Sequence, residues 1–185
     1  MIELTYVTGN KVKLELAQKL FGPYGIKVIG KKIDCPEIQA DTNEEIAKYS
    51  SKYASNILKT AVLKNDTGLI IPVLNGFPGP YTRYIEEKIT EDGILKLMQG
   101  KENREAYFIE CLAYTEYGKE PIVFISKTKG KIALESSGKN GWGYDYIFIP
   151  EGYNLPLANF DEETQDNMWS SEGYQQLAEY LINKE

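Results

Sequence analysis

The first 60 residues alternate between strand-like and helix-like patterns, and this alternation restricts the possible folds more than any other feature of the chain. Residues 2–8 alternate apolar and polar side chains, as in a half-buried strand. Asn10 can cap a helix that ends before Gly22, and a second strand follows over residues 26–29. A capping box, Thr-x-x-Glu, begins the next helix at Thr42. A strand, a helix and a strand in this order favour an α/β protein.

The remainder of the chain carries further signals of the same two kinds. The expected strands cover residues 61–63, 106–114, 121–127, 131–134 and 146–149, and the expected helices cover 90–99 and 171–183. The three strands between 106 and 134 are typical of an antiparallel meander with a turn at 116–119. We therefore predict an α/β fold with a mixed β-sheet flanked by helices, formed by a single domain over residues 1–185.

The composition argues against several classes of protein. The 185 residues hold no apolar run near the ~20 that a membrane-spanning helix needs, and the start MIELTYVTGN lacks the pattern of a signal peptide. A net charge of −6 argues against a nucleic acid polymer as partner, because such binding depends on phosphate neutralisation. Cys35 and Cys111 have no disulfide or metal spacing, which is typical of reduced thiols in a cytoplasmic protein.

The chain contains no histidine. Catalysis by Ser–His or Cys–His pairs and metal sites with histidine ligands are therefore excluded. Chemistry in this protein must use carboxylates, hydroxyls, lysines or a metal bound by oxygen.

The segment TGNKVK runs from the end of the first expected strand into the first helix. Its threonine, asparagine and lysines, together with amide groups at a helix N-terminus, are suited to binding phosphate. The alternative is an ordinary turn in which Asn10 caps the helix and the lysines are solvated.

An acid, Asp66, follows the short strand 61–63 in the segment NDTGL. We expect the strand to break there, so that the carboxylate sits at a sheet edge. If Asp66 lies near Glu37 of the segment CPEIQAD, the two carboxylates suit a hard cation such as Mg²⁺. Asp-Thr-Gly is also the active-site triplet of aspartic proteases, but those are almost entirely β and need a second such aspartate, whereas this chain has helix patterns at 10–21 and 43–58.

The segment GKNGWGYDYIFIP carries three glycines around Trp142, which allow an aromatic ring to stand out from a tight loop. Such a ring can stack on a nucleobase. The alternative is a loop whose aromatic side chains fill the core.

Taken together, these segments resemble the Ham1 family of inosine triphosphate pyrophosphatases. The shared segments, in order, are TGNKVK, PEIQ, NDTGL followed by NGFPGPYTR, GILKLM and GWGYDYIFIPEG. The resemblance covers nearly the whole chain. It implies an elongated mixed sheet flanked by helices, two lobes around a deep cleft, and a homodimer.

The resemblance implies hydrolysis of a nucleoside triphosphate to a monophosphate and pyrophosphate, by attack of water on the α-phosphorus. In this pattern Glu37 and Asp66 hold Mg²⁺, and Asp66 is also the general base. Phosphoryl transfer of this kind depends on positioning and charge neutralisation, which suits a site without histidine.

The same pattern assigns further residues to the triphosphate. They are Thr8, Asn10 and Lys13 near the N-terminus, and Thr67 and Gly68 beside the catalytic acid.

At the base end the pattern has Trp142 stacking on the nucleobase, where the family usually has Phe. Gly143, Tyr144 and Asp145 then line the nucleoside pocket. Ser170 begins the nearest match to the family's Ser-His-Arg-Gly motif.

The chain departs from the family where the family's lysine, histidine and arginine read the purine. Between Lys139 and Lys184 it has no Lys, Arg or His, Glu172 stands at the place of the arginine, and Asn65 replaces the usual acid before Asp66. One hypothesis is an active pyrophosphatase with a base preference altered from ITP and XTP; the alternative is a catalytically weakened nucleotide-binding or interaction protein. Because the polar groups of 161–176 are rich in acceptors, we expect them to favour a base with an exocyclic amino group.

Overall fold

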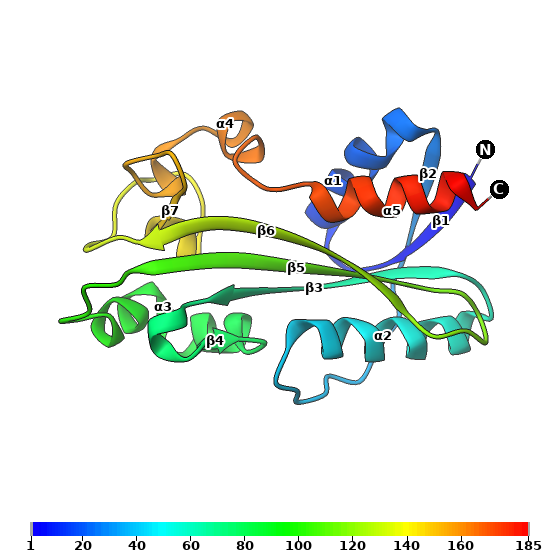
Figure 1. Ribbon diagram of the computed structural model, residues 1–185, viewed down its shortest axis with the longest axis horizontal. Coiled ribbons are helices and arrows are strands. Elements are labelled where there is room, and N and C mark those ends of the chain that lie inside the picture. The colour runs from blue at the N-terminus through cyan, green and yellow to red at the C-terminus, as the bar shows by residue number, and fades with distance from the viewer. Residues whose placement is uncertain (1, 185) are drawn as a thin grey trace. The chain divides into compact units, whose positions relative to one another are not determined.

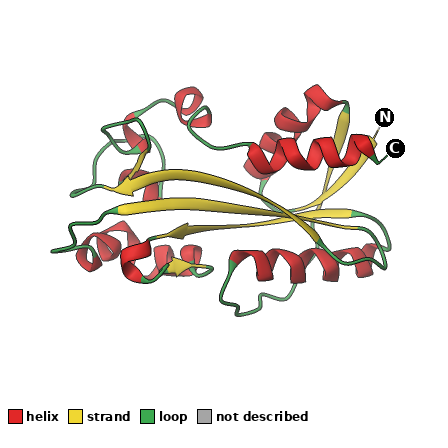
Figure 2. Cartoon of the chain, in the orientation of Figure 1, coloured by secondary structure: helices red, strands yellow, loops and turns green. Residues whose placement is uncertain are grey.

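The computed structural model describes residues 2–184 and contains a sheet of seven strands with helices packed against it (Figures 1 and 2). The strands are β1 (Ile2–Val7), β2 (Ile26–Lys31), β3 (Val62–Ile70), β4 (Pro78–Gly79), β5 (Glu105–Thr115), β6 (Ile122–Ile132) and β7 (Phe148–Pro150). The helices are α1 (Lys11–Phe21), α2 (Asn43–Leu58), α3 (Thr82–Leu97), α4 (Glu162–Asp166) and α5 (Glu172–Asn183).

The strand order is β2-β1-β3-β5-β6-β7, with β4 paired to β3. β1 runs parallel to β2 and β3, whereas β4 is antiparallel to β3 and β7 is antiparallel to β6. The predicted mixed α/β sheet flanked by helices is therefore confirmed. No helix within residues 2–184 is both long enough and apolar enough to span a bilayer.

The described chain divides into two compact units, which we call the first and second unit. The first comprises residues 2–66, 110–126 and 171–184, and the second comprises 67–109 and 127–170. The division falls within strands β3, β5 and β6, which contribute residues to both units. A single domain over the whole chain, and a cleft between two lobes, stay predictions.

In the first unit the sheet is covered on both faces, and alternation along the strands decides which residue faces which helices. On β1, Leu4 and Tyr6 pack in the core that α1 and α5 cover, whereas Val7 packs with Ala54 of α2. Figure 1 shows α1 and α5 on one side of these strands and α2 on the other. On β3, Leu63 belongs to the first of these faces and Val62 to the second.

The second unit has its own apolar core, built from β3, α3, β7 and the loop before α5. Phe108 packs its ring edge against Phe148 and Trp169, with ring centroids 4.9 and 5.2 Å away. The guanidinium of Arg104 donates hydrogen bonds to three backbone carbonyls, those of Met98, Ile132 and Ala133. This core holds the loop that carries Trp142.

Two predicted boundaries near Asp66 and in the meander are wrong. The strand expected over 61–63 continues to Ile70, so that Asp66 lies inside β3 and the chain does not break there. A polar residue is tolerated within the strand because its side chain finds polar partners, described below. The two strands expected on either side of 128–130 are one strand, β6. Gly130 allows this strand to pair closely with β7, because a Cβ at Gly130 would clash with the carbonyl oxygen of Ile149.

Two further elements differ in extent. The helix expected from residue 90 begins at Thr82, and Thr90 interrupts it with a φ of 57°. The prediction therefore covered only the part of α3 that follows this interruption. The strand expected over 146–149 is β7, Phe148–Pro150, preceded by a 3₁₀ helix over Gly143–Tyr146. The helix predicted over 171–183 is confirmed as α5.

Candidate active site

Asp66 is held by the first residue of α2. The side-chain amide of Asn43 donates a hydrogen bond of 2.7 Å to Oδ2 of Asp66, and Asn43 is only 3% exposed. Asp66 and Val62 are four residues apart on β3, so both project toward the face that α2 covers. The hydrogen bond from a buried amide fixes one carboxylate oxygen and thereby sets the direction of the other.

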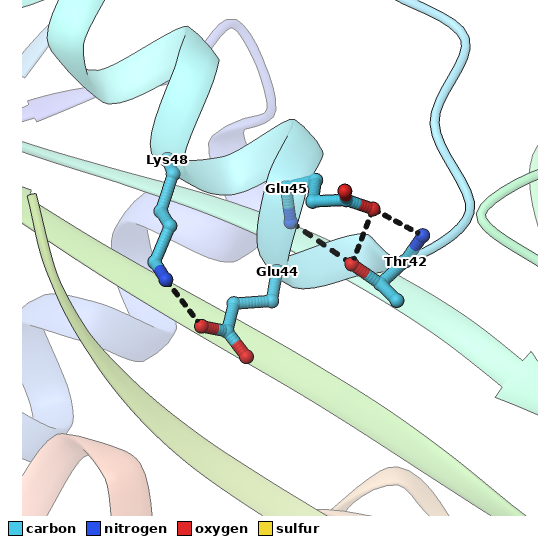
Figure 3. A network of polar contacts seen from close by, with 4 residues as sticks. All are labelled: Thr42, Glu44, Glu45 and Lys48. Atoms are coloured by element: carbon cyan, nitrogen blue, oxygen red, sulfur yellow. Dashed lines mark hydrogen bonds and ion pairs between the residues drawn. The ribbon is translucent and has the colours of Figure 1, made fainter.

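The capping box of α2 positions Asn43. Thr42 accepts a hydrogen bond from the backbone N–H of Glu45, and the carboxylate of Glu45 accepts from the backbone N–H and the hydroxyl of Thr42 (Figure 3). Lys48 forms an ion pair with Glu44 across one turn (Figure 3). Because the cap fixes where α2 begins, it also fixes the residue that contacts Asp66.

Sequence reasoning did not identify Asn43 as a site residue. Its only sequence signal is its place directly after the N-cap, where a buried asparagine is unusual, and burial cannot be read from the capping box.

Asn65, the neighbour of Asp66, points to the opposite face of the sheet. Lys13 of α1 donates from Nζ to Oδ1 of Asn65 at 3.4 Å, and Nδ2 of Asn65 donates to Oε1 of Glu110 on β5 at 2.6 Å. Consecutive strand residues alternate between faces, so Asp66 contacts α2 on one side of the sheet and Asn65 contacts α1 on the other. Lys13 therefore contacts the residue of β3 that directly precedes Asp66.

Thr8 and Asn10 form the turn that leads into α1. The Thr8 hydroxyl accepts from the backbone N–H of Asn10 at 3.1 Å, and the Asn10 side chain accepts from the backbone N–H of Lys13 at 3.2 Å. Asn10 is therefore the helix cap that the ordinary interpretation of TGNKVK required. The cap also orients the first turn of α1, from which Lys13 reaches β3.

Glu37 is exposed, in the loop between β2 and α2 that ends at the capping box. Within residues 2–184, no group of three or more His, Cys, Asp or Glu side chains gathers into a metal centre. The metal ligands predicted from the sequence are the carboxylates of Glu37 and Asp66. Two carboxylates suit Mg²⁺ where substrate oxygens and water complete its octahedral shell. Carboxylate oxygens are donors of the kind that this ion prefers.

Thr67 and Gly68 lie within β3 in the second unit, Thr67 half-buried and Gly68 buried. The next residue, Leu69, donates its backbone N–H to the hydroxyl of Thr82 at 2.7 Å. These two residues are thus part of a paired strand, whereas the sequence prediction placed them after a strand break.

The second unit carries the segment predicted to meet the nucleobase. Trp142 is 68% exposed, so the alternative of a loop whose aromatic side chains fill the core is wrong for Trp142, whereas Tyr144 of the same loop does lie in the core. The backbone N–H of Trp142 donates to the carboxylate of Asp145 at 3.1 Å. The hydroxyl of Tyr146 donates to the carbonyl of Gly141 at 2.8 Å, which closes the loop beneath the tryptophan.

Gly143 and Tyr144 pack against α3. Gly143 has a φ of 57°, and a Cβ there would lie 2.6 Å from a carboxylate oxygen of Glu86. Both its conformation and its contact thus favour glycine. Tyr144 is buried, and its hydroxyl donates to the carbonyl of Thr82 at 3.3 Å.

Burial sets the electrostatics of this loop. It raises the pKa of Asp145, which the hydrogen bond from Trp142 partly offsets. Burial, followed by the charges of Glu87, Glu91 and Asp145, raises the pKa of Glu86, and Arg83 acts in the opposite direction. The pKa of the Tyr144 phenol is also raised, chiefly by burial. The carboxylates of Glu86 and Asp145 therefore lie against the backbone of this loop.

In segment 161–176 the side-chain amide nitrogens already have acceptors. Nε2 of Gln165 donates to the carbonyls of Asn140, Leu157 and Phe160, and Nδ2 of Asn167 donates to the carbonyl of Glu163. The amides of Gln175 and Gln176 donate to the side chains of Ser171 and Glu172. Ser170 lies within this segment, in which each side-chain amide donates at least one hydrogen bond, and its own backbone N–H donates to the Thr128 hydroxyl.

Comparison with known proteins identifies the family of the chain. A sequence model described as the Ham1 family matches residues 4–173. A protein of Methanopyrus kandleri named dITP/XTP pyrophosphatase is 43% identical over 162 residues, covering 88% of this chain and 86% of the relative. A protein of Thermococcus kodakarensis with the same name is 41% identical, covering 90% of each chain.

Solved structures give the same result. The Staphylococcus aureus Ham1 protein and a HAM1 protein from Coxiella burnetii each superpose with a TM-score of 0.84 at 27% identity, covering 99% of this chain and 100% of theirs. The match in sequence extends over nearly the whole chain, and so does the match in structure. The chain therefore belongs to the Ham1 family.

Proposed function

We propose that this protein is a nucleoside triphosphate pyrophosphatase that cleaves the bond between the α- and β-phosphates, releasing a nucleoside monophosphate and pyrophosphate. One observation carries the proposal: Asn43 holds the carboxylate of Asp66 in a fixed direction, and the ammonium of Lys13 contacts the adjacent residue of the same strand, Asn65. A cation for phosphate and a base for water are the two groups that this hydrolysis needs. The names of the relatives support the same activity.

In the proposed mechanism, Asp66 accepts a proton from the water that attacks the α-phosphorus. The oxygen of water bonds to phosphorus as the bond to the bridging oxygen breaks, and pyrophosphate leaves with that oxygen and its electron pair. The Asn43 amide fixes the carboxylate of Asp66, and Lys13 offsets the negative charge of the phosphates. Mg²⁺, for which Glu37 and Asp66 are the proposed ligands, would supply charge neutralisation at the phosphate oxygens.

The remaining contacts divide between the two ends of the substrate. We assign Thr8, Asn10, Thr67 and Gly68 to the phosphates.

At the base end, Trp142 is the proposed stacking platform. Its high exposure supports this role, because a ring already packed in the core could not receive a base. Gly143, Tyr144, Asp145 and Ser170 are assigned to the nucleoside.

The proposal extends to base preference, which we expect to be weaker for ITP and XTP than the names of the relatives indicate. A keto oxygen needs a donor, and each side-chain amide of 161–176 already donates at least one hydrogen bond within the protein. The carboxylates of Glu86 and Asp145 lie against the tryptophan loop and offer acceptors there. Acceptors match a base with an exocyclic amino group and repel a keto oxygen.

A single assay tests activity and preference together. Pyrophosphate release is measured with Mg²⁺ for ITP, XTP, ATP, GTP, dCTP and dUTP, and kcat/KM values are compared. We expect pyrophosphate from at least one of them and less than about a tenfold advantage of ITP or XTP over ATP. A large preference for ITP and XTP would contradict the altered base preference alone. Absence of pyrophosphate with every nucleotide would contradict the enzyme itself.

The proposal includes a homodimer in the cytoplasm. Light scattering at assay concentration tests the assembly, and a monomer mass would contradict it.

A further inference from the structure

Glu110 on β5 occupies the centre of a hydrogen-bonded chain that the mechanism above does not use. Its Oε1 accepts from Nδ2 of Asn65 at 2.6 Å and from the hydroxyl of Tyr174 at 2.9 Å. Asn65 in turn accepts from the ammonium of Lys13 through its Oδ1 at 3.4 Å. The hydrogen-bonded chain thus runs from Tyr174 of α5 through Glu110 of β5 and Asn65 of β3 to Lys13 of α1. All four residues belong to the first unit.

The carboxylate determines which end of the Asn65 amide faces the lysine. An ionised carboxylate only accepts hydrogen bonds, so the NH₂ group of Asn65 must face Glu110. The carbonyl oxygen of Asn65 is then left for Lys13. If the amide turned over, its NH₂ group would meet the ammonium, which also only donates, and that contact would be repulsive.

Two buried phenols bound the other side of Glu110. Tyr174 is 2% exposed and Tyr6 is 0% exposed, and both belong to the apolar core of the first unit. Among the described residues, the hydroxyl of Tyr6 is the buried side-chain polar atom without a hydrogen-bond partner. Burial raises the pKa of both phenols, and the charge of Glu110 acts in the same direction. The phenols therefore stay protonated, and Tyr174 stays a donor that holds Glu110 in place.

Lys13 contacts this chain through a neutral amide and not through the carboxylate itself. An ion pair would have to be broken, at a cost in desolvation and attraction, before the ammonium could bind phosphate. A single long hydrogen bond to an amide oxygen aims the ammonium and is easily exchanged for a phosphate oxygen. The ammonium of Lys13 is thereby oriented and still available to bind phosphate.

We infer that Glu110 is a positioning residue for the triphosphate: held by Tyr174, it orients the Asn65 amide, and the amide aims Lys13 at the phosphates. The inference rests on the proposed function only for the identity of the ligand. Glu110 touches neither substrate nor reacting atoms in this scheme. Its effect must therefore pass through Lys13, which makes it separable from a merely structural role.

The experiment is a double-mutant cycle on phosphate binding. Inorganic tripolyphosphate with Mg²⁺ is titrated into the wild type, Glu110→Gln, Lys13→Ala and the double variant, and binding is followed by calorimetry. The amide introduced by Glu110→Gln can donate as well as accept, so the Asn65 amide is free to turn over. We expect Glu110→Gln to weaken binding about tenfold in the wild-type background and less than about twofold once Lys13 is absent.

Two further variants check the chain and its specificity. Tyr174→Phe removes only the hydroxyl that donates to Glu110, and a smaller loss of binding in the same direction is expected. Glu3→Gln removes a charge from an exposed ion pair with Lys27 and is expected to change nothing. If Glu110→Gln is destabilised, the cycle still decides the question, because a general loss of fold would weaken both backgrounds alike.

Equal effects of Glu110→Gln in both backgrounds, no effect in either, or no tripolyphosphate binding by the wild type would each overturn the inference. The proposed function is tested by a different measurement, release of pyrophosphate from nucleotides by the wild type. Coupled binding without release would refute the function and keep the inference. Release of pyrophosphate without coupling between Glu110 and Lys13 would keep the proposed function and refute the inference. In an active enzyme, Glu110→Gln should raise KM and leave kcat within about twofold.

Discussion

The candidate catalytic side chains of the first unit are held by side chains from other elements, whereas the exposed tryptophan of the candidate base loop in the second unit is held through its backbone. Asp66 depends on Asn43 from α2, and Lys13 contacts Asn65 of β3. The Trp142 loop instead closes through Trp142 N–H to Asp145 and Tyr146 to the Gly141 carbonyl, all within five residues.

The difference indicates which part of the site can change without loss of the fold. A side chain held across elements cannot be replaced without leaving a partner unsatisfied. A loop can alter a side chain that is exposed and that is held only through its backbone. The chemistry end is thus constrained, and the base end is open to changes in specificity.

The strongest test of the constrained end is Asp66→Asn. The substitution keeps the size of the side chain and removes the proton acceptor, so kcat for pyrophosphate release should fall by about a thousandfold or more. Melting temperature, measured alongside, should change little. Activity within about tenfold of the wild type would mean that another group activates the water.

Asn43→Ala tests whether the contact across elements matters for function. The carboxylate of Asp66 loses its 2.7 Å hydrogen bond and with it a fixed orientation, so kcat should fall about tenfold to a hundredfold. Asn56→Ala, an exposed asparagine on the same helix, is the matched control and should behave as the wild type. Equal kinetics of the two variants would remove Asn43 from the site.

Trp142→Ala tests the adjustable end. Loss of stacking, on the order of 1–3 kcal/mol for a base, should raise KM about tenfold or more for every nucleotide, with kcat nearly unchanged. Because Trp142 is 68% exposed, the melting temperature should not fall. Trp142→Phe should recover most of the affinity. A rise in KM for one base only would show that the ring reads base identity and does not merely stack.

The smallest expected effect concerns the carboxylates behind the loop. The pKa of Glu86 is raised in the folded state, so the folded state binds this proton more tightly than the unfolded one. Stability from this group is then full below the unfolded pKa and is lost as pH rises through the folded pKa. Glu86→Gln should therefore raise the melting temperature at pH 7.5, and the gain should disappear near pH 4.

The control for this measurement is Glu102→Gln, which changes the same charge in an exposed loop. A gain of equal size in both variants would assign the effect to net charge. An equal gain of Glu86→Gln at both pH values would contradict the assigned direction of the pKa shift.

Elements with local signals were predicted well from the sequence. Asn10 and Thr42 are caps because a short polar side chain can satisfy N–H groups two or three residues ahead, and that contact needs no tertiary structure. Alternation in residues 2–7 predicted β1 for a similarly local reason.

The continuation of β3 through Asp66 could not be predicted in this way. Polar residues at 64–67 interrupt the apolar pattern, and only the neighbouring strand β5 explains why the backbone stays extended beyond the pairing with β1. The partners of these side chains lie 45 residues away along the chain in one case and 23 in another. Pairing over such distances leaves no periodic trace in a single chain.

The sequence by itself determined the α/β class, the capped helices, the absence of histidine chemistry and the segments that resemble the Ham1 family, because each depends on residue type and short spacing. Only the tertiary structure decided that Asp66 faces Asn43, that Asn65 joins Lys13 to Glu110, and that Trp142 is exposed. The physical reason is that a strand residue's face and burial are set by what packs beside it. A sequence specifies those neighbours only through the whole fold.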